Sequence, residues 1–344
     1  MTDELCMQRA LDIAQQGAGH VSPNPMVGCV LVADGRVIGE GYHQKYGGAH
    51  AEVHAVQSVR PEDEHLLAQA TAYVTLEPCA HFGKTPPCAD LLISKQVKRV
   101  VVAIEDPFPL VAGKGIQRMR EAGIKVDVGV LADEAAWINR RFLVAVKKNR
   151  PFIILKWAES ADGFMGTTDR KPVAISDKPS LFLSHRWRTE EDAILVGSTT
   201  VLQDNPSLTA RYWQGRNPKR IVLDKRGRID TSYQIRDEAA ETLIFTQNQE
   251  ILSPQHQFID PTLDFEAEVL NFLFKNGVRS ILVEGGQQVL NDWIEKKLFD
   301  EIRTITSPNR LREGIASPRV PAGVVLKESY AIGIDTYRQF TNLY

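Results

Sequence analysis

Residues 50–52 read HAE, and residues 75–88 read TLEPCAHFGKTPPC. Together they place one histidine, one glutamate and two cysteines in a single pattern. A catalytic zinc ion takes three ligands from the protein, typically histidine nitrogens, thiolates or carboxylates, and keeps a fourth position open for water. His50, Cys79 and Cys88 supply such a set, so the sequence predicts a catalytic zinc site.

Glu52 lies two residues after His50 and is predicted to move protons rather than to bind the metal. Bound zinc acidifies water enough to give hydroxide near neutral pH. Zinc deaminases combine this ion with a glutamate that serves as general acid and base, and their two cysteines are usually separated by two residues. Here eight residues separate Cys79 from Cys88. The pattern therefore predicts a hydrolytic deaminase with a long insert between its cysteines.

Other interpretations of the nearby residues are plainer. A single buried cysteine is more often a small core residue than a ligand, and this is the interpretation given to Cys6 and Cys29. His54 follows His50 by one helical turn, as in metalloproteases, where a glutamate directly follows the first histidine. Ala51 occupies that position here, so His54 is interpreted as a structural or supporting residue.

The bulk composition sets the broad class. A chain of 344 residues is long enough for two domains. Its 43% hydrophobic and 24% charged residues are typical of a globular protein. The formal net charge of -2 gives no overall basic field that would attract nucleic acid or a membrane surface. The sequence shows neither a signal peptide nor an apolar run of about 18 residues, so a cytoplasmic location is expected.

Strand-like and helix-like segments alternate along the chain, which predicts largely parallel sheets covered by helices. The charged segment 147–151 ends in proline and breaks this pattern, so domains are expected at residues 1–146 and 151–344. Strands are expected at residues 27–32, 72–76, 99–104, 125–130, 152–156, 193–196, 220–223, 242–246, 280–283 and 301–306. Helices are expected near residues 51–59, 89–95, 113–122, 132–146, 178–188, 265–276 and 288–297, after an N-terminal helix whose apolar members are Leu5, Met7, Leu11 and Ile13.

The first domain resembles the deaminase half of the bifunctional riboflavin-biosynthesis deaminase/reductase family. The resemblance rests on residues 22–28, 41–43, 50–53, 75–79, 84–88, 105–107 and 111–115. It implies a three-layer α/β fold like that of cytidine deaminase. The implied substrate is a 2,5-diaminopyrimidinone with a ribosylamino 5-phosphate group, whose 2-amino group is replaced by oxygen. Asn24, His43 and Lys84 are implied to contact it, although Asn24 between two prolines could equally be a turn residue.

The second half carries weaker motifs. Residues 283–286 read VEGG between an expected strand and helix, where glycines let the backbone approach a phosphate. A Gly-Gly pair is more often a simple turn. This segment nevertheless resembles the reductase half of the same family, together with residues 156–163, 194–197, 200 and 204–211. That resemblance implies a dihydrofolate-reductase-like fold, NADPH as cofactor, and hydride transfer to C1 of the ribosylamino group.

The resemblance also implies roles for single residues of the second domain. The implied cofactor contacts are Ala158, Thr200, Asp204, Gly285 and Gly286. The implied substrate contacts are Lys156, Arg188, Leu208, Arg211 and Glu284. The two arginines suit a phosphate because the planar guanidinium binds it through two hydrogen bonds. The chain departs from the usual family pattern at Phe164, Lys171, Val173 and Asn309.

Two alternatives to a bifunctional enzyme remain open at this stage. One is an active deaminase whose second domain binds ligand without transferring hydride, and NADPH consumption separates it from the bifunctional enzyme. The other is a deaminase of RNA bases, which needs a basic groove and stacking aromatic side chains. The balanced charge argues against RNA, so the expected partners are a small phosphorylated molecule and further copies of the chain, without nucleic acid or membrane.

Overall fold

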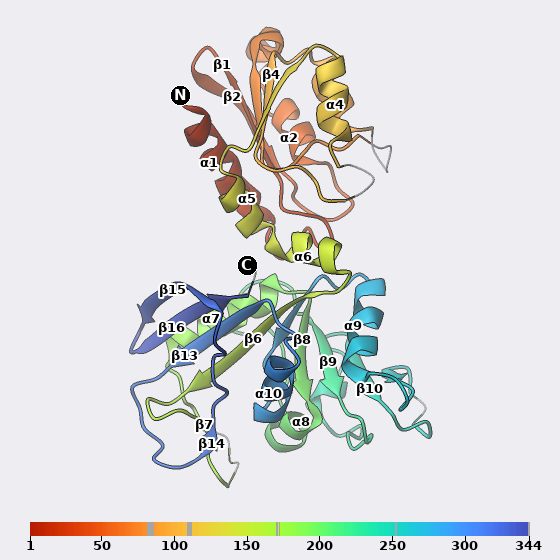
Figure 1. Cartoon of the computed structure of the whole chain (residues 1–344), viewed down its shortest axis with the longest axis vertical. Helices are drawn as coiled ribbons and strands as arrows, with labels where there is room; N and C mark the ends of the chain where they lie inside the picture. Colours follow the sequence, from red (N-terminus) through yellow and green to blue (C-terminus); the bar gives the residue numbers. More distant parts are fainter. Residues whose placement is uncertain (81–85, 109–111, 170, 172, 252, 343–344) are drawn as a thin grey trace. The chain divides into compact units, whose positions relative to one another are not determined.

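The computed structural model describes residues 1–80, 86–108, 112–169, 171, 173–251 and 253–342. The chain forms two compact units, Met1–Asn149 and Arg150–Tyr344 (Figure 1). Their junction lies within the charged segment 147–151 in which the sequence breaks its helical pattern. Among the helices described, none is both long enough and apolar enough to cross a membrane.

The first unit contains a five-stranded sheet in the order β2-β1-β3-β4-β5. Its strands are β1 (Gly28–Ala33), β2 (Arg36–Tyr42), β3 (Thr71–Val74), β4 (Arg99–Val102) and β5 (Lys125–Val128). The three strands β3, β4 and β5 are parallel, whereas β1 is antiparallel to both β2 and β3. The expectation of a largely parallel sheet is therefore correct only for β3, β4 and β5, because long crossover connections join these strands.

Helices cover both faces of this sheet, which gives three layers. They are α1 (Asp3–Ala14), α2 (Ala51–Gln57), α3 (Cys88–Ser94), α4 (Lys114–Glu121), α5 (Ala132–Ile138) and α6 (Arg140–Lys148), with short 3-10 segments at Gln15–Gly17 and Pro61–Gln69. Neighbouring residues of β1 point to opposite faces. Leu31 belongs to a core with α2, α3 and α4, and Val30 belongs to a core with α1 and α5.

Two helix expectations for this unit are wrong. Leu5 is 59% exposed, because α1 turns Cys6, Met7 and Ala10 toward the sheet instead. The stretch 132–146 is two helices, α5 and α6, which meet at the buried residue Asn139.

The second unit contains a nine-stranded sheet in the order β11-β10-β9-β8-β12-β6-β13-β16-β15. Its strands are β6 (Phe152–Glu159), β8 (Ala193–Gly197), β9 (Lys219–Leu223), β10 (Thr242–Thr246), β11 (His256–Phe258), β12 (Ser280–Val283), β13 (Glu301–Thr306), β15 (Val325–Ile332) and β16 (Asp335–Thr341), and β7 (Phe164–Gly166) pairs with β14 (Ile315–Ala316) apart from it. From β11 to β13 all neighbours are parallel, and β16 and β15 add an antiparallel hairpin.

Helices of the second unit also pack on both faces of its sheet. They are α7 (Lys178–Glu190), α8 (Ser198–Asp204), α9 (Phe265–Lys275) and α10 (Gln287–Glu295), with a 3-10 turn at Gln234–Arg236. Leu195 of β8 shares a core with α9 and α10, whereas its neighbours Ile194 and Val196 share one with α8. The mixed α/β fold of both units agrees with the fold class expected from the sequence.

Candidate functional site

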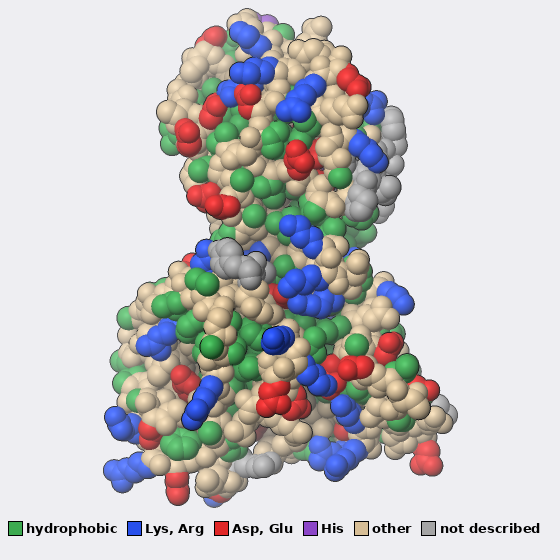
Figure 2. Space-filling model, viewed as in Figure 1, with side chains coloured by type: hydrophobic (Ala, Val, Ile, Leu, Met, Phe, Trp, Pro, Cys, Tyr) green, Lys and Arg blue, Asp and Glu red, His purple; other side chains and the backbone are tan. Residues whose placement is uncertain are grey.

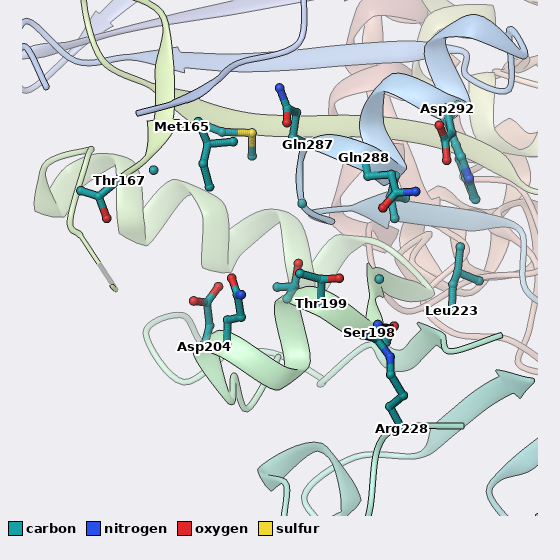
Figure 3. A pocket seen from close by; sticks show the side chains of 18 of the residues that line it. Met165, Thr167, Ser198, Thr199, Asp204, Leu223, Arg228, Gln287, Gln288 and Asp292 are labelled. Atoms are coloured by element: carbon teal, nitrogen blue, oxygen red, sulfur yellow. Dashed lines mark hydrogen bonds between the residues drawn. The ribbon is translucent and has the colours of Figure 1, made fainter. Parts of the chain in front are cut away.

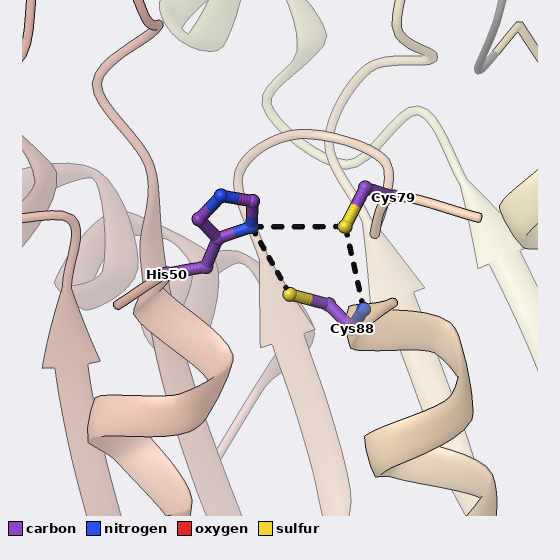
Figure 4. A group of neighbouring side chains, drawn as sticks. All are labelled: His50, Cys79 and Cys88. Carbon is purple, nitrogen blue, oxygen red and sulfur yellow. Dashed lines mark hydrogen bonds between the residues drawn. The ribbon is translucent and has the colours of Figure 1, made fainter. Parts of the chain in front are cut away.

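The candidate metal ligands of the first unit come from three separate segments. His50 immediately precedes α2, Cys79 lies in the loop after β3, and Cys88 is the first residue of α3. The Nδ1 atom of His50 lies 3.2 Å from Sγ of Cys88 and 3.7 Å from Sγ of Cys79 (Figure 4). All three candidate ligand atoms lie within 4.8 Å of one another. One imidazole and two thiolates that converge in this way fit a catalytic zinc ion.

The environment of the two cysteines favours one thiolate before any metal binds. The pKa of Cys79 is lowered to about 4, chiefly because the Cys88 thiol donates to its sulfur. The backbone N–H of Cys88 also donates to this sulfur, at 3.3 Å. The Cys79 thiolate in turn raises the pKa of both Cys88 and His50. Cys79 thus offers a thiolate to which a metal cation can bind.

Glu52 lies in the first turn of α2 and is only 3% exposed. Burial is the main reason why the pKa of its carboxyl is raised above the ordinary value. A carboxyl group with a raised pKa can hold and release a proton closer to neutral pH. Cys29 of β1 is fully buried near this charge, as expected for a core cysteine.

Asn24 and His43 lie side by side near the cluster. The Nδ1 atom of His43 is 2.9 Å from the carbonyl oxygen of Ala49, and its Nε2 is 3.1 Å from the Nδ2 of Asn24. Both contacts are satisfied by a neutral ring that donates from Nδ1 and accepts at Nε2. Burial lowers the pKa of His43, which favours that neutral form. Its ring meets the His50 ring edge-on at 5.5 Å, whereas Lys84 lies outside the described residues.

Two buried residues for which no role was predicted from the sequence support this site. Asn139 accepts from the backbone N–H of Met26 at 2.8 Å and donates to the carbonyl of the same residue at 2.9 Å. It thereby fixes the segment that begins with Asn24. Glu77 lies in the loop after β3, two residues before Cys79, and is 4% exposed. Only the place of Glu77 within the cysteine motif could have pointed to it.

A cavity of about 910 Å³ opens in the second unit at the carboxyl ends of β8, β9 and β12. Ligands of open α/β sheets bind at such strand ends. Thr199 and Asp204 of α8 face Gln287 and Gln288 of α10 across it (Figure 3). The volume lies within the usual range for small-molecule and cofactor sites.

The expected cofactor residues divide into two groups. Thr200, Asp204 and Gly286 line the cavity, whereas Ala158 and Gly285 are not among its lining residues. Of the departures from the family pattern, Lys171 and Val173 line it as well. Its wall also contains three basic residues that the sequence did not single out: Lys225, Arg226 and Arg228.

The expected substrate residues form an ionic cluster beside β6. Arg188 of α7 donates from Nε and Nη2 to the two oxygens of Glu284, at 3.0 and 2.8 Å, and from Nη1 to the carbonyl oxygen of Thr209 at 3.0 Å. Burial alone would raise the pKa of Glu284, but the charges of Arg188 and Lys156 bring it down to about 2. The structure therefore pairs Arg188 with a carboxylate of the protein itself.

Arg211 and a histidine missed by the sequence analysis complete the cluster. Arg211 donates to the hydroxyl of Ser207 at 2.6 Å and lies over the ring of Tyr212, which meets the ring of His185 at 4.8 Å. Burial and the charges of Arg188 and Arg211 lower the pKa of His185 to about 4. His185 lies three residues before Arg188, and therefore on the same face of α7. The cluster thus contains Lys156, Arg188 and Arg211 but a single carboxylate, that of Glu284. This excess of basic side chains suits an anionic ligand.

Leu208 also lies in this region but is a different kind of residue. It is 3% exposed, has a left-handed φ of 51°, and packs in the core under α8. Its buried side chain therefore anchors the segment between Asp204 and Arg211 to the core. Any contact with substrate stays a prediction.

Two family models match separate parts of the chain. Residues 1–104 match the model of the cytidine and deoxycytidylate deaminase zinc-binding region, and residues 151–317 match that of the RibD C-terminal domain. Riboflavin biosynthesis protein RibD of Aquifex aeolicus is 38% identical over 321 residues, which cover 91% of this chain and 89% of that protein. The RibD of Escherichia coli K12 is 37% identical over 335 residues, with coverage of 90% and 89%.

Solved structures show the same likeness in three dimensions. A deaminase/reductase of Thermotoga maritima, described as acting on diaminohydroxyphosphoribosylaminopyrimidine and 5-amino-6-(5-phosphoribosylamino)uracil, superimposes with a TM-score of 0.91 at 36% identity. RibD of Acinetobacter baumannii superimposes with a TM-score of 0.87 at 34% identity. In both comparisons 98% of each chain is covered.

Proposed function

Since this chain belongs to the family of riboflavin biosynthesis protein RibD, a bifunctional enzyme with a deaminase and a reductase domain, we propose that its two units act in turn on one pyrimidine. The first unit hydrolytically deaminates 2,5-diamino-6-(5-phosphoribosylamino)pyrimidin-4-one. The second unit then reduces the ribosylamino group of the product to a ribitylamino group with NADPH. The observation that carries the proposal is the convergence of His50, Cys79 and Cys88 beside the buried Glu52.

In the first reaction, water adds at C2 of the pyrimidine and ammonia leaves. Zinc, when bound to His50, Cys79 and Cys88, supplies a water molecule that ionises near neutral pH. Glu52 accepts a proton from the attacking water and delivers it to the neighbouring ring nitrogen. It then takes the remaining proton from the hydroxyl of the adduct and delivers it to the departing amine, which leaves as ammonia while the carbonyl forms. Its burial keeps this proton within the site, because bulk water cannot exchange with it freely.

Residues around the metal cluster orient the pyrimidine. His43 and Asn24 are already joined by a hydrogen bond, so the amide oxygen of Asn24 is left to accept from the substrate. Lys84, in the insert between the cysteines, is proposed to bind the 5-phosphate through its positive charge.

In the second reaction, NADPH supplies a hydride to C1 of the sugar, and the ring oxygen that C1 releases takes up a proton. We assign the cofactor to the cavity lined by Thr200, Asp204 and Gly286. Gly285 and Ala158 are assigned to the cofactor on the family resemblance alone. Lys225, Arg226 and Arg228 favour a cofactor with an additional phosphate, which supports NADPH over NADH. Lys156, Arg188, Leu208, Arg211 and Glu284 are assigned to the substrate.

The two alternatives have less support. The departures at Lys171 and Val173 leave the cavity open, so a second unit that binds ligand without hydride transfer has no better support than a reductase. On the face of each unit shown in Figure 2, basic and acidic side chains are interspersed, unlike the continuous basic groove that RNA requires.

Assembly and location stay predictions. β15 lies at an edge of the nine-stranded sheet, and Val325, Leu326 and Tyr330 on this strand are exposed. We propose that this edge contributes to a homo-oligomer, which sedimentation of the full chain would test. The cytoplasmic location expected from the sequence is a separate proposal.

Substitution of the proton carrier tests the deaminase assignment. Glu52→Gln should retain zinc but release ammonia from the diaminopyrimidine at least about 100 times more slowly, since general acid–base catalysis contributes that much or more. Zinc content and ammonia are measured on the same sample. A variant with full zinc and wild-type ammonia release would remove Glu52 from this role.

A further inference from the structure

Glu77 is a buried carboxylate that the proposed chemistry does not use. It follows β3, lies two residues before Cys79, and is 4% exposed. Its oxygens accept hydrogen bonds from four backbone N–H groups, those of Gly115 at 2.8 Å, Gly113 at 2.9 Å, and Asp106 and Ile116 at 3.2 Å. A buried carboxylate needs this number of donors because each of its oxygens otherwise loses its hydration.

The four hydrogen bonds join the cysteine loop to the start of α4. This helix follows Gly113, which has a φ of 77° and no side chain that could cap the first N–H groups. Glu77 supplies the missing acceptor from a segment about 36 residues earlier in the chain, and its negative charge lies at the positive end of the helix dipole. α4 and the segment after β3 are therefore fixed to each other at one carboxylate.

The contact is closest beside the metal ligand. A Cβ on Gly115 would lie 1.9 Å from the carbonyl oxygen of Pro78, so the backbone of α4 touches the peptide that joins Pro78 to Cys79. On its other side, the carbonyl oxygen of Cys79 accepts from the backbone N–H of Ala89 at 3.1 Å. The backbone of Cys79 thus lies between α4 and α3.

Arg118 of α4 reaches the same region. Its Nε lies 2.7 Å from Oδ1 of Asp90 in α3, and its Nη1 donates to the carbonyl oxygen of Ala80 at 3.4 Å. α4 therefore contacts the residue after one cysteine and the helix that the other cysteine begins. A displacement of α4 would move both sulfur atoms relative to His50.

From this geometry we infer that Glu77 is a positioning residue of the zinc site, which holds Cys79 at bonding distance from the metal by anchoring its loop to α4. The inference rests on the proposed role of Cys79 as a zinc ligand. It predicts that the loss of Glu77 weakens metal binding itself, and that folding of the second unit is unaffected.

The test compares Glu77→Gln with wild type in the full-length chain. Glutamine keeps the shape but turns an NH2 group toward N–H donors. Asp63→Asn is the matched control, because Asp63 is a buried carboxylate of the same unit whose ion pair is with Arg36. Zinc affinity is measured by competition with a chelator, and the cobalt-substituted protein is examined for its thiolate-to-cobalt absorption. NADPH-dependent reduction by the second unit serves as an internal measure of folded protein.

Glu77→Gln should weaken zinc binding by about tenfold or more, the usual effect of an altered supporting residue. It should also reduce the thiolate-to-cobalt band, whereas Asp63→Asn should change neither. If the first unit of Glu77→Gln does not fold, Glu77→Asp, which keeps the charge, is measured in its place. Unchanged zinc affinity and an unchanged cobalt spectrum, even with lower thermal stability, would overturn the inference. A wild-type zinc affinity in Cys79→Ser would instead overturn the proposed ligand set on which it rests.

Discussion

At the residue scale, metal binding by His50, Cys79 and Cys88 is coupled to the release of protons. Before metal binds, Cys79 is the thiolate, and its charge raises the pKa of both Cys88 and His50. Cys88 can bind a metal ion as a thiolate only after its proton leaves. Metal affinity must therefore increase as the pH rises.

Zinc binding should release at least the proton of Cys88 near neutral pH, so that the logarithm of the affinity rises with pH with a slope of about one or more. Chelator competition between pH 6 and 8, together with calorimetry in buffers of different ionisation enthalpy, measures this number. His54→Gln is the control, because His54 is not among the clustered ligands, and its slope should equal that of wild type. An affinity independent of pH would contradict the thiolate assignment.

Glu284 offers a second residue-scale test, in the second unit. The ordinary pKa of its carboxyl is 4.5, and the folded protein lowers it to about 2. A lowered pKa stabilises the fold fully above pH 4.5, and this stabilisation is lost as the pH falls through about 2. Arg188, which is mostly buried, depends on this carboxylate for its charge balance.

Glu284→Gln should therefore destabilise the second unit by about 3 kcal/mol and remove part of its acid sensitivity below pH 4.5. Urea unfolding followed by tryptophan fluorescence measures the loss, because four of the five tryptophans lie in this unit. Glu190→Gln, which alters a more exposed pair with Arg186 on the same helix, should change stability by less than about 1 kcal/mol. Equal effects of the two substitutions would refute the buried-pair account.

At the scale of elements, most helices and strands whose apolar residues recur with one clear period were predicted from the sequence. The strands of the parallel cores are short runs of apolar residues between turns, and they were placed within a few residues. β2 was missed although Asp34-Gly35 is a hairpin signal, and both residues have positive φ. Gly39 and Gly41 weaken its strand pattern, yet α2 requires them, since a Cβ on Gly41 would lie 2.4 Å from the N of Ala55.

The break between α5 and α6 could not be predicted from the sequence either. Residues 132–146 have a continuous helical pattern, and the break at Asn139 depends on the backbone of Met26, which is distant in sequence. The metal ligands could be predicted because they lie in local motifs. The pairing of Arg188 with Glu284 could not be predicted, because these residues are 96 positions apart in the chain. Such long-range hydrogen bonds leave no periodic signal in the chain.

Asn139→Ala tests the element-scale role of this break. The loss of both hydrogen bonds to Met26 should destabilise the first unit by about 1–3 kcal/mol and raise the deaminase KM more than it lowers kcat, since the segment with Asn24 loosens. Denaturation and steady-state kinetics measure the two effects. Asn276→Ala, at the end of α9 in the second unit, is the control and should leave deaminase kinetics unchanged. An unchanged KM would show that Asn139 serves stability alone.

At the scale of the whole molecule, one chain contains two sites of different chemistry. The first unit brings three candidate metal ligands together with a buried acid, and the second brings a cavity of about 910 Å³ together with a cationic cluster. Each unit has cores and a sheet of its own. We therefore propose two consecutive reactions on one phosphorylated pyrimidine, with the amino group removed first.

The mass of the product tests this claim most directly. The zinc-loaded full chain is given freshly prepared diaminopyrimidine substrate, with and without NADPH, and the products are analysed by mass spectrometry. Without NADPH we expect only exchange of the amino group for oxygen, and with NADPH a further gain of two hydrogen atoms. Deamination with no hydrogen gain in the presence of NADPH, or hydrogen gain on a substrate that keeps its amino group, would contradict the account.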